Sequence, residues 1–366
     1  MNYSLSLSGI IIPSWVLLTA SFVISFVIAY ISIPTVVLIS KFKKLFDIPN
    51  ERASHTGDVP VLGGLSVFAG FSLAAIICTI PDESGTMKYL LGGIIVLFFL
   101  GLKDDVLVVD PKKKFVGQII AAIIVVIFGD VRITNFHLVF GIDNISNLSS
   151  ILFSLFLFLL LINGFNLIDG VDGLASGIGT LICLATGVWF IMAGHYYYSI
   201  IGFALAGALL AYMRFNIFDG KNKIFMGDTG SMITGLIVTV LVVKFLEYVR
   251  YAPQTLQFES APALAFSLVI VPMFDTLRII VVRISRGSSP FKSDKNHIHH
   301  SLLNLGYSHV KATITIITIN IMLVLFVVVF QKLGNIPLII IMLILALILS
   351  LLPKIILAGR KKFTTV

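Results

Sequence analysis

WVLLTASFVISFVIAYISIPTVVLI, residues 15–39, is an uninterrupted run of apolar and small polar side chains. About 20 such residues are enough for a helix to cross a hydrocarbon core of about 30 Å. The run is too long for the core of a signal peptide, and no convincing small-residue cleavage site follows it. It predicts a retained transmembrane helix.

Similar runs recur to the end of the chain, and 58% of its 366 residues are hydrophobic while 12% are charged. A soluble domain carries roughly 25% charged residues. We therefore predict an all-α, polytopic membrane protein that forms a single domain over residues 1–366. The eleven predicted spans lie near 15–39, 61–80, 88–102, 114–130, 150–163, 173–194, 196–213, 229–247, 261–283, 309–331 and 335–358.

Lysine and arginine are concentrated in alternate loops, which predicts the orientation of the chain. The loops that are rich in lysine and arginine follow the first, third, seventh, ninth and last predicted spans. We therefore expect these loops and the C-terminus to lie in the cytoplasm and the N-terminus to lie outside. The same rule explains the net charge of +8 without a nucleic-acid partner. Cys78 and Cys183 both lie inside apolar spans, which argues against a disulfide framework or a cysteine metal site.

Charged and amide side chains gather at the cytoplasmic ends of the predicted spans, beginning with Asp104 and Asp105. Adjacent residues on a helix point about 100° apart, so these two carboxylates cannot have the same role. One could face a metal or substrate while the other orients a lysine or backbone group. A solvated helix end is the alternative, although acids at a helix C-terminus oppose the macrodipole.

Asn163, Asn166, Asp169 and Asp172 follow one another at a strict spacing of three, with glycines between them. This spacing keeps side chains on roughly one face of a helix or 3₁₀ turn. Oxygen ligands on one face suit a hard cation such as Mg²⁺. The alternative is that these polar groups solvate a helix–loop–helix junction.

The segment Gly227-Asp228-Thr229-Gly230-Ser231 opens the eighth predicted span. Free amide groups at a helix N-terminus attract phosphate, and the hydroxyls of Thr229 and Ser231 add donors. An ordinary N-cap role for Asp228 is the alternative.

Basic residues and three histidines fill the loop after the ninth span, where His297, His299 and His300 stand close together. Histidines at these spacings can bind zinc. The surrounding arginines and lysines would repel a cation and suit an anionic phosphate better. Anchoring by positive charge explains the basic residues but not the histidines.

Two other features carry less evidence. Arg52 and His55 precede a Pro and Gly turn in the first cytoplasmic loop, which fits contact with a phosphate or head group. Asp275 and Arg278 lie three residues apart inside the ninth span, where an intramembrane ion pair with a structural role is expected.

Hard-metal ligands, amide-lined helix ends and cations for phosphate, all at one interface, are the groups that phosphoryl transfer needs. The membrane location implies that one substrate is a lipid. A secondary transporter is the rival class, but transporter sites lie near the bilayer midplane on paired repeats, and no repeat is visible here.

The order of motifs resembles the polyprenyl-phosphate N-acetylhexosamine-1-phosphate transferases, the MraY/WecA superfamily, from about Asn50 to Ala312. The motifs are Arg-x-x-His before Pro-x-x-Gly-Gly, the Asp-Asp pair, Asn-x-x-Asn-x-x-Asp-Gly-x-Asp-Gly, Gly-Asp-x-Gly-Ser and His-Ile-His-His. Five motifs in the same order make the resemblance specific.

Residues 289–300 are similar to the branch that transfers GlcNAc-1-phosphate from UDP-GlcNAc. The phospho-MurNAc-pentapeptide branch has three consecutive histidines followed by an acidic residue. Here Ile298 interrupts the histidines and Ser301 follows them, which disfavours the pentapeptide substrate.

The resemblance implies a bacterial inner-membrane enzyme with a cytoplasmic active site, which uses a UDP-N-acetylhexosamine and undecaprenyl phosphate and can form a homodimer. It implies Mg²⁺, replaceable by Mn²⁺, on Asp228 and Asn166. The implied catalytic residues are Asp104 and Asp105 near the acceptor phosphate and Asp169 and Asp172 at the nucleotide or metal. The expected substrate-binding residues are Arg52, His55, Asn163, Thr229, His297, His299 and His300.

A phosphate monoester has a second pKa of about 6, so a lipid phosphate is largely dianionic at pH 7. It can therefore attack the β-phosphorus of UDP-GlcNAc with little help from a general base. Direct displacement of UMP is favoured on this ground. Double displacement through a phosphorylated Asp104 or Asp105 stays open at this point.

Overall fold

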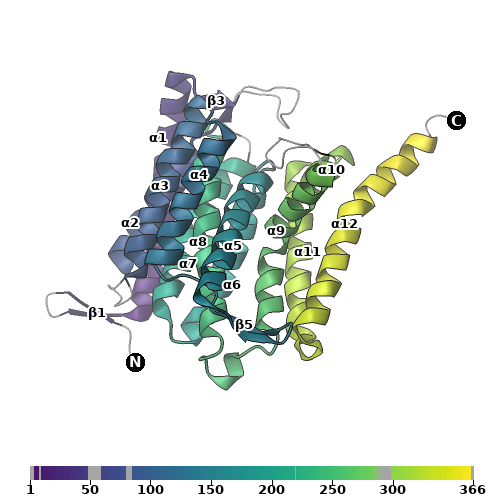
Figure 1. Ribbon diagram of the computed structural model, residues 1–366. Helices are drawn as coiled ribbons and strands as arrows, with labels where there is room; N and C mark the ends of the chain where they lie inside the picture. Colours follow the sequence, from purple (N-terminus) through teal and green to yellow (C-terminus); the bar gives the residue numbers. More distant parts are fainter. Residues whose placement is uncertain are drawn as a thin grey trace.

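The computed structural model describes residues 4–7, 10–47, 59–79, 85–218, 220–285, 287 and 298–363. Figure 1 shows a bundle of roughly parallel helices, with small two-stranded pieces at its ends. The chain is an all-α polytopic membrane protein, as predicted.

The helices are α1 Ser14–Lys43, α2 Gly63–Cys78, α3 Thr86–Leu107, α4 Pro111–Ile123, α5 Asn147–Ile168, α6 Leu174–Met192, α7 Tyr196–Ile217, α8 Gly227–Tyr248, α9 Ala261–Ser285, α10 Ile298–Asn304, α11 His309–Val329 and α12 Asn335–Phe363. A π-helical segment, Ile124–Phe128, continues α4, and short 3₁₀ turns lie at Gln254–Leu256 and Gln331–Leu333. The antiparallel strand pairs are β1 Ser4–Leu7 with β2 Ile10–Pro13, β3 Phe46–Asp47 with β4 Val59–Pro60, and β5 Asn135–Val139 with β6 Ile142–Asn144.

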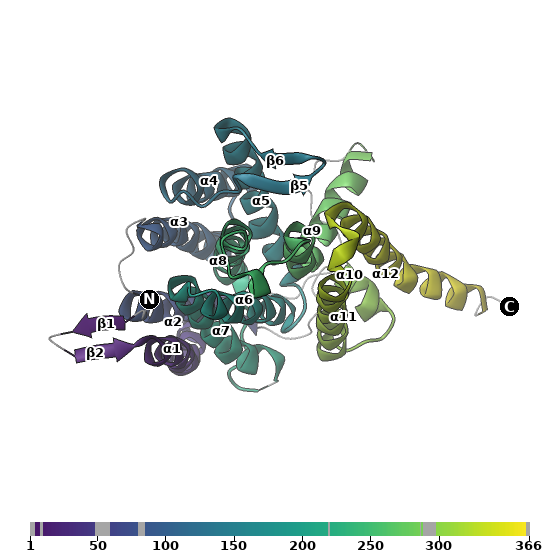
Figure 2. The same ribbon diagram turned by 90° about the horizontal axis from the view of Figure 1, so that it is seen from below.

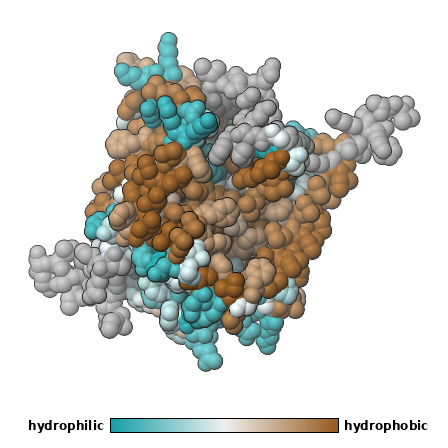
Figure 3. All heavy atoms as spheres, viewed as in Figure 1, coloured by the Kyte–Doolittle hydropathy of each residue, from teal (hydrophilic) through white to brown (hydrophobic). Residues whose placement is uncertain are grey.

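Each of the eleven predicted spans falls on a helix, with α4 and its π-helical continuation accounting for 114–130. Within the described residues, eight helices are long and apolar enough to cross a membrane: α1, α5, α6, α7, α8, α9, α11 and α12. α2 is a shorter apolar helix of 16 residues. The surface in Figure 3 carries a broad hydrophobic band between more hydrophilic ends, as expected of a chain that lies in a bilayer.

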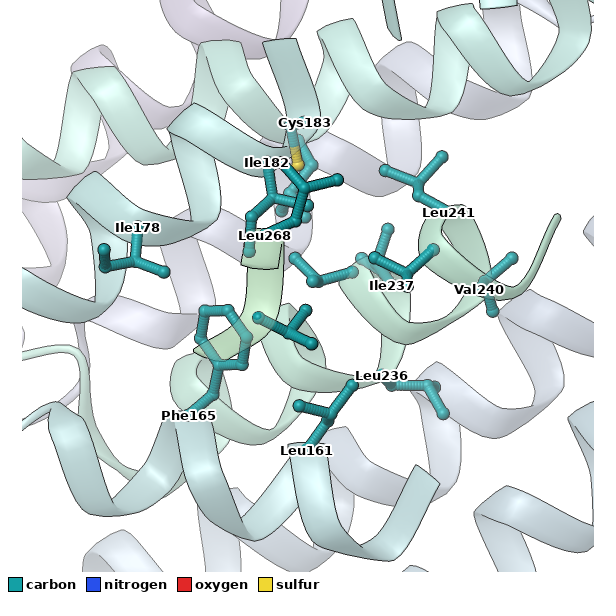
Figure 4. Packing of buried hydrophobic residues seen from close by; sticks show 14 of the residues in the cluster. Leu161, Phe165, Ile178, Ile182, Cys183, Leu236, Ile237, Val240, Leu241 and Leu268 are labelled. Carbon is teal, nitrogen blue, oxygen red and sulfur yellow. The ribbon is translucent and has the colours of Figure 1, made fainter. Parts of the chain in front are cut away.

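α8 is the central helix of the bundle. In the end-on view of Figure 2 it is surrounded by other helices, and it contacts α2, α3, α5, α6, α7 and α9. Apolar side chains on nearly every face of α8 explain this position, because a helix that is hydrophobic all round is buried. Figure 4 shows Leu236 and Ile237 of α8 packed among Phe165 of α5 and Ile182 of α6.

Glycines allow three helices to approach closely at the start of α8. A Cβ on Gly64 of α2 would lie 2.2 Å from the backbone nitrogen of Gly230, and one on Gly101 of α3 would lie 2.5 Å from the Cα of Thr229. No side chain fits these contacts. The last turn of α3 therefore lies directly against the first turn of α8.

The helix ends that carry the polar motifs meet at one end of the bundle. The C-termini of α3 and α5 and the N-terminus of α8 lie there, together with α10, while β5 and β6 lie at the other end (Figure 1). Inside α9, Arg278 donates to Asp275 at 3.0 Å, which confirms the predicted ion pair. Asp275 also accepts a hydrogen bond from the backbone of Ile298 at 3.2 Å and so ties α10 to α9.

Candidate active site

Asp105, in the last turn of α3, caps the N-terminus of α8. One carboxylate oxygen accepts from the backbone N–H of Asp228 at 2.7 Å, and the other accepts from the N–H and hydroxyl of Thr229 at 3.2 and 2.6 Å. The acid that opposes the dipole of its own helix therefore faces the positive end of another helix. This capping explains why an acid stands at the end of α3.

The cap changes two expectations from the sequence. Asp228 is not the N-cap of α8, because the helix begins at Gly227 and Asp228 lies in its first turn. Thr229 is fully buried, and its hydroxyl is already donated to Asp105. Thr229 thus has a structural role in holding Asp105, whereas from the sequence we expected its hydroxyl to contact a phosphate.

Lys114, in the first turn of α4, bridges two carboxylates. Its ammonium lies 2.5 Å from Oδ2 of Asp228 and 3.0 Å from Oδ2 of Asp104. The other oxygen of Asp104 accepts from the backbone N–H of Val109 at 2.5 Å. Sequence analysis missed Lys114 because it belongs to the run Lys112–Lys114, which the positive-inside rule explains as a whole.

The ladder of Asn and Asp residues does not form one ligand face. Asn166 of α5 donates to Oδ1 of Asp228 and, at 3.0 Å, to the hydroxyl of Ser231. Asn163, one turn earlier, exchanges two hydrogen bonds with the buried amide of Gln118 on α4, at 2.8 and 3.3 Å. Asn163 therefore braces α5 against α4, and Gln118 is a second residue that the sequence did not single out.

Asp169 and Asp172 lie in the turn that follows α5, where the helix has ended. Asp172 forms an ion pair with Lys223 at 2.9 Å, and its backbone carbonyl accepts from Thr313 of α11 at 2.7 Å. These contacts tie the turn to two other segments. Asp172 thus has an evident structural role beside the catalytic one that we expected.

Asp169 has no hydrogen-bond or ion-pair partner among the described residues. Burial raises the pKa of Asp169 well above its usual range, and the carboxylates of Asp228, Asp105 and Asp172 add to the rise. A carboxyl in this position is either protonated or close to a cation. Asp169 thus lies in a cluster of acidic side chains, the carboxylate centre, at the start of α8.

The donors of this centre fit a hard divalent cation. Asp228 and Asn166 are in direct contact and both carry oxygen ligands, with other carboxylates around them. Both oxygens of Asp228 accept from nitrogen donors, Lys114 and Asn166, so a bound cation would have to replace these donors. Among the described residues, no group of three or more His, Cys, Asp or Glu side chains is arranged to hold a metal.

A cavity of about 590 Å³ opens beside the centre, between α4, α5 and α9. Asp104, Lys114 and Asn166 form its polar wall, and side chains such as Phe156 and Ile280 form its apolar wall. Arg283 of α9, which is 7% exposed, also lines it. Arg283 is the last residue of the ninth predicted span, and the sequence pattern did not single it out as a site residue.

Several expected substrate-binding residues fall outside the described part of the chain. Arg52, His55 and His297 are among them. His299 and His300 belong to α10, but their side chains are not described. Their expected contacts stay predictions.

Comparison with known proteins shows which family the chain belongs to. A family model described as glycosyl transferase family 4 matches residues 87–246, which include both Asp104-Asp105 and Asp228. The decaprenyl-phosphate N-acetylglucosaminephosphotransferase of Mycolicibacterium smegmatis is 34% identical over 291 residues, covering 73% of this chain and 71% of the relative. The chain belongs to the polyprenyl-phosphate N-acetylhexosamine-1-phosphate transferases.

Two other members of this transferase family show how far the likeness extends. The decaprenyl-phosphate N-acetylglucosaminephosphotransferase of Mycobacterium tuberculosis is 33% identical over 290 residues, covering 73% of this chain and 71% of the relative. The undecaprenyl-phosphate alpha-N-acetylglucosaminyl 1-phosphate transferase of Escherichia coli K12 is 29% identical over 283 residues, covering 76% of this chain and 74% of the relative. The resemblance predicted from the five motifs is therefore confirmed.

Proposed function

We propose that the protein transfers GlcNAc-1-phosphate from UDP-GlcNAc to a polyprenyl phosphate such as undecaprenyl phosphate, with release of UMP. One observation carries the proposal: a single cavity joins the charged centre at the start of α8 to an apolar wall between α5 and α9. A lipid phosphate needs both environments in one place, because its head is anionic and its chain is apolar. The names of the relatives, which transfer GlcNAc-1-phosphate, support the same substrates.

Cations on the cavity wall suit the acceptor head group. Lys114 and Arg283 both line the cavity, and their charges attract a phosphate dianion. The apolar side chains of Phe156, Leu159 and Ile280 offer a surface for the first isoprene units. The acceptor phosphate would then lie beside Asp104 and Asp228.

The reaction can proceed by one in-line displacement. An oxygen of the acceptor phosphate forms a bond to the β-phosphorus of UDP-GlcNAc, and the bond from that phosphorus to the bridging oxygen breaks. UMP leaves with the bridging oxygen, so no proton has to move. Mg²⁺ bound at Asp228 and Asn166 would neutralise the negative charge that develops on the diphosphate.

The geometry favours this route over a phosphorylated aspartate. Both oxygens of Asp105 accept hydrogen bonds from the start of α8. One oxygen of Asp104 accepts from Val109, and the other faces Lys114. Both oxygens of Asp105 are thus engaged by α8, and nucleophilic attack by Asp104, which lines the cavity, would require Asp104 to give up its contact with Val109 or with Lys114.

The distribution of lysine and arginine supports eleven spans, with the N-terminus outside and the centre at the cytoplasmic face of a bacterial inner membrane. A centre at the cytoplasmic face is accessible to a soluble UDP-sugar, and the cavity between α5 and α9 is accessible to the lipid acceptor.

Mass spectrometry of the lipid product tests the function. Purified protein receives Mg²⁺, undecaprenyl phosphate and, in separate reactions, UDP-GlcNAc, UDP-GalNAc, UDP-glucose or UDP-MurNAc-pentapeptide. We expect undecaprenyl-diphospho-GlcNAc as the main product. If UDP-MurNAc-pentapeptide is instead the preferred donor, the protein belongs to the phospho-MurNAc-pentapeptide branch of the family. Uptake of intact UDP-GlcNAc into sealed proteoliposomes, with no lipid product, would instead identify a transporter.

A further inference from the structure

The end of the bundle opposite the carboxylates carries a feature that the transferase reaction does not use. The hairpin β5–β6 packs beside the last turn of α8, whereas Asp228 lies in the first turn. α8 has 22 residues, so about 33 Å separates its two ends. That is close to the thickness of a bilayer hydrocarbon core, about 30 Å. The hairpin therefore lies at the opposite membrane interface.

Apolar side chains point outward from the tip of this hairpin. Leu138 is 69% exposed, Phe140 is 77% exposed, and Ile142 beside them is 43% exposed. In water, a short turn of this kind is normally built from Gly, Asn or Asp. The turn here is Phe140-Gly141, and the large exposed side chains of Phe140 and of its strand neighbours Leu138 and Ile142 indicate that its surroundings are not purely aqueous.

The backbone holds these side chains outward at a conformational cost. His137, Leu138 and Phe140 have φ values of 50°, 59° and 55°, in the left-handed region that residues other than glycine rarely adopt. Such outliers persist only where the surrounding structure fixes them.

The base of the hairpin is fixed by polar contacts. The backbone N–H and the hydroxyl of Thr134 both donate to the carboxylate of Glu247 at 2.9 Å. A ring nitrogen of His137 lies 3.1 Å from the carbonyl oxygen of Leu246, and the amide of Asn135 donates to Asp143 at 2.7 Å. The tip therefore has one orientation relative to α8.

A cavity of about 240 Å³ lies against the hairpin, with walls from β5, α5, α8, α9 and α12. Its lining is almost wholly apolar and includes Phe136, Phe153, Ala265, Val269 and Ile339. Phe153 is 40% exposed on the surface of α5, so one residue of the cavity wall also belongs to the outer surface of the bundle.

We infer that the β5–β6 hairpin is an interfacial anchor whose tip enters the leaflet opposite the carboxylate centre, and that the cavity against it holds an acyl chain of a phospholipid. The apolar tip, the apolar cavity and the outward face of α5 then form one continuous lipid contact. The anchor fixes the depth of α8 in the bilayer, since the hairpin base is bonded to the last turn of that helix. This inference does not depend on the transferase reaction.

Site-directed spin labelling tests the anchor in proteoliposomes. Cys78 and Cys183, both buried, are first replaced by alanine, and a nitroxide is attached to Leu138→Cys or Phe140→Cys. The exposed Asn144→Cys on the same hairpin is the matched control. We expect the labels at 138 and 140 to collide with oxygen several-fold more often than with an aqueous nickel chelate, and the label at 144 to show the reverse. Equal access of the nickel chelate to 140 and 144 would overturn the anchor.

Native mass spectrometry tests the cavity. Protein extracted gently from phospholipid bilayers should retain one phospholipid more than the variant Ala265→Phe, in which the added ring fills the cavity. Val281→Phe adds the same ring to an exposed part of α9 away from the cavity and should retain the full number. Ala265→Leu repeats the test if the larger side chain prevents folding. Unchanged phospholipid retention in a folded Ala265 variant would contradict the cavity assignment.

Discussion

Single residues at the start of α8 show how a membrane protein holds several acids together. Asp105 is stabilised by the N–H groups of α8, and Asp104 shares the ammonium of Lys114 with Asp228. Asp169 lacks such a partner among the described residues. The centre is therefore partly neutralised by the protein and partly left for a cation.

Replacing Asp169 with asparagine should increase stability in a pH-dependent way. Burial raises the pKa of Asp169 in the folded protein, with the neighbouring carboxylates Asp228, Asp105 and Asp172 adding to the rise. The folded state thus keeps a proton that the unfolded chain loses, so stability falls as pH rises from the unfolded pKa to the folded pKa, by up to about 1.4 kcal/mol per unit. The stability of Asp169→Asn should not fall in this way, because asparagine does not ionise.

Thermal unfolding in EDTA between pH 5 and pH 8 measures the difference. We expect the advantage of Asp169→Asn over the wild type to grow with pH. An advantage that is constant or shrinks over this range would show that the carboxyl is not held protonated by its surroundings.

Lys114→Met should lower turnover by about a hundredfold or more, because it removes a cation from the centre. It should also lower the concentration of Mn²⁺ needed for half-saturation, since the ammonium no longer competes for Asp228. Lys113→Met is the matched control, because Lys113 is exposed and adjacent. Mn²⁺ binding followed by electron paramagnetic resonance, together with UMP release, makes both comparisons. Equal effects of the two substitutions would remove Lys114 from the site.

At the scale of helices, the close packing of α3 against α8 places the acids. Gly101 lies one turn before Asp105, and its missing side chain lets α3 touch the backbone of Thr229. The Asp105 cap depends on this approach, and the position of Asp228 depends on the cap.

Gly101→Ala should therefore reduce turnover strongly, because its methyl group would push the start of α8 away from Asp105. Gly92→Ala in the same helix is the control, since its Cβ would lie 3.4 Å from a side-chain atom of Ile124, an ordinary contact. UMP release and thermal unfolding of both variants give the comparison. Similar activities for the two folded variants would contradict the role of this packing.

The sequence predicted the helical segments more accurately than the partners of individual side chains. The eleven segments predicted from hydrophobic length are all helical, and eight of the described helices are long and apolar enough to cross a membrane. The spacing of Asn163 and Asn166 predicted a shared face, yet Asn163 bonds Gln118 while Asn166 bonds Asp228. Which partner each side chain meets depends on α4 and α8, and spacing within α5 carries no information about either. Lys114 was missed because the positive-inside rule explains the run Lys112–Lys114 as a whole.

For the whole molecule, we expect the carboxylate centre and the β5–β6 hairpin to lie on opposite sides of the membrane. Cysteines introduced at Lys221 and Tyr251, at opposite ends of the bundle, test this in a background without Cys78 and Cys183. An impermeant thiol reagent should label position 251 in intact cells and position 221 only after permeabilisation. The opposite labelling pattern would place the centre outside.

Acceptor-dependent UMP release by the purified protein tests the central claim most directly. With UDP-GlcNAc and Mg²⁺, we expect release only when polyprenyl phosphate is present, one UMP for each lipid product, and none in EDTA. Folded Asp228→Asn protein should be inactive. A stoichiometric burst of UMP without the lipid would contradict direct displacement. Full activity of Asp228→Asn, or no lipid-dependent release from the wild type, would contradict the assignment of this centre as the transferase site.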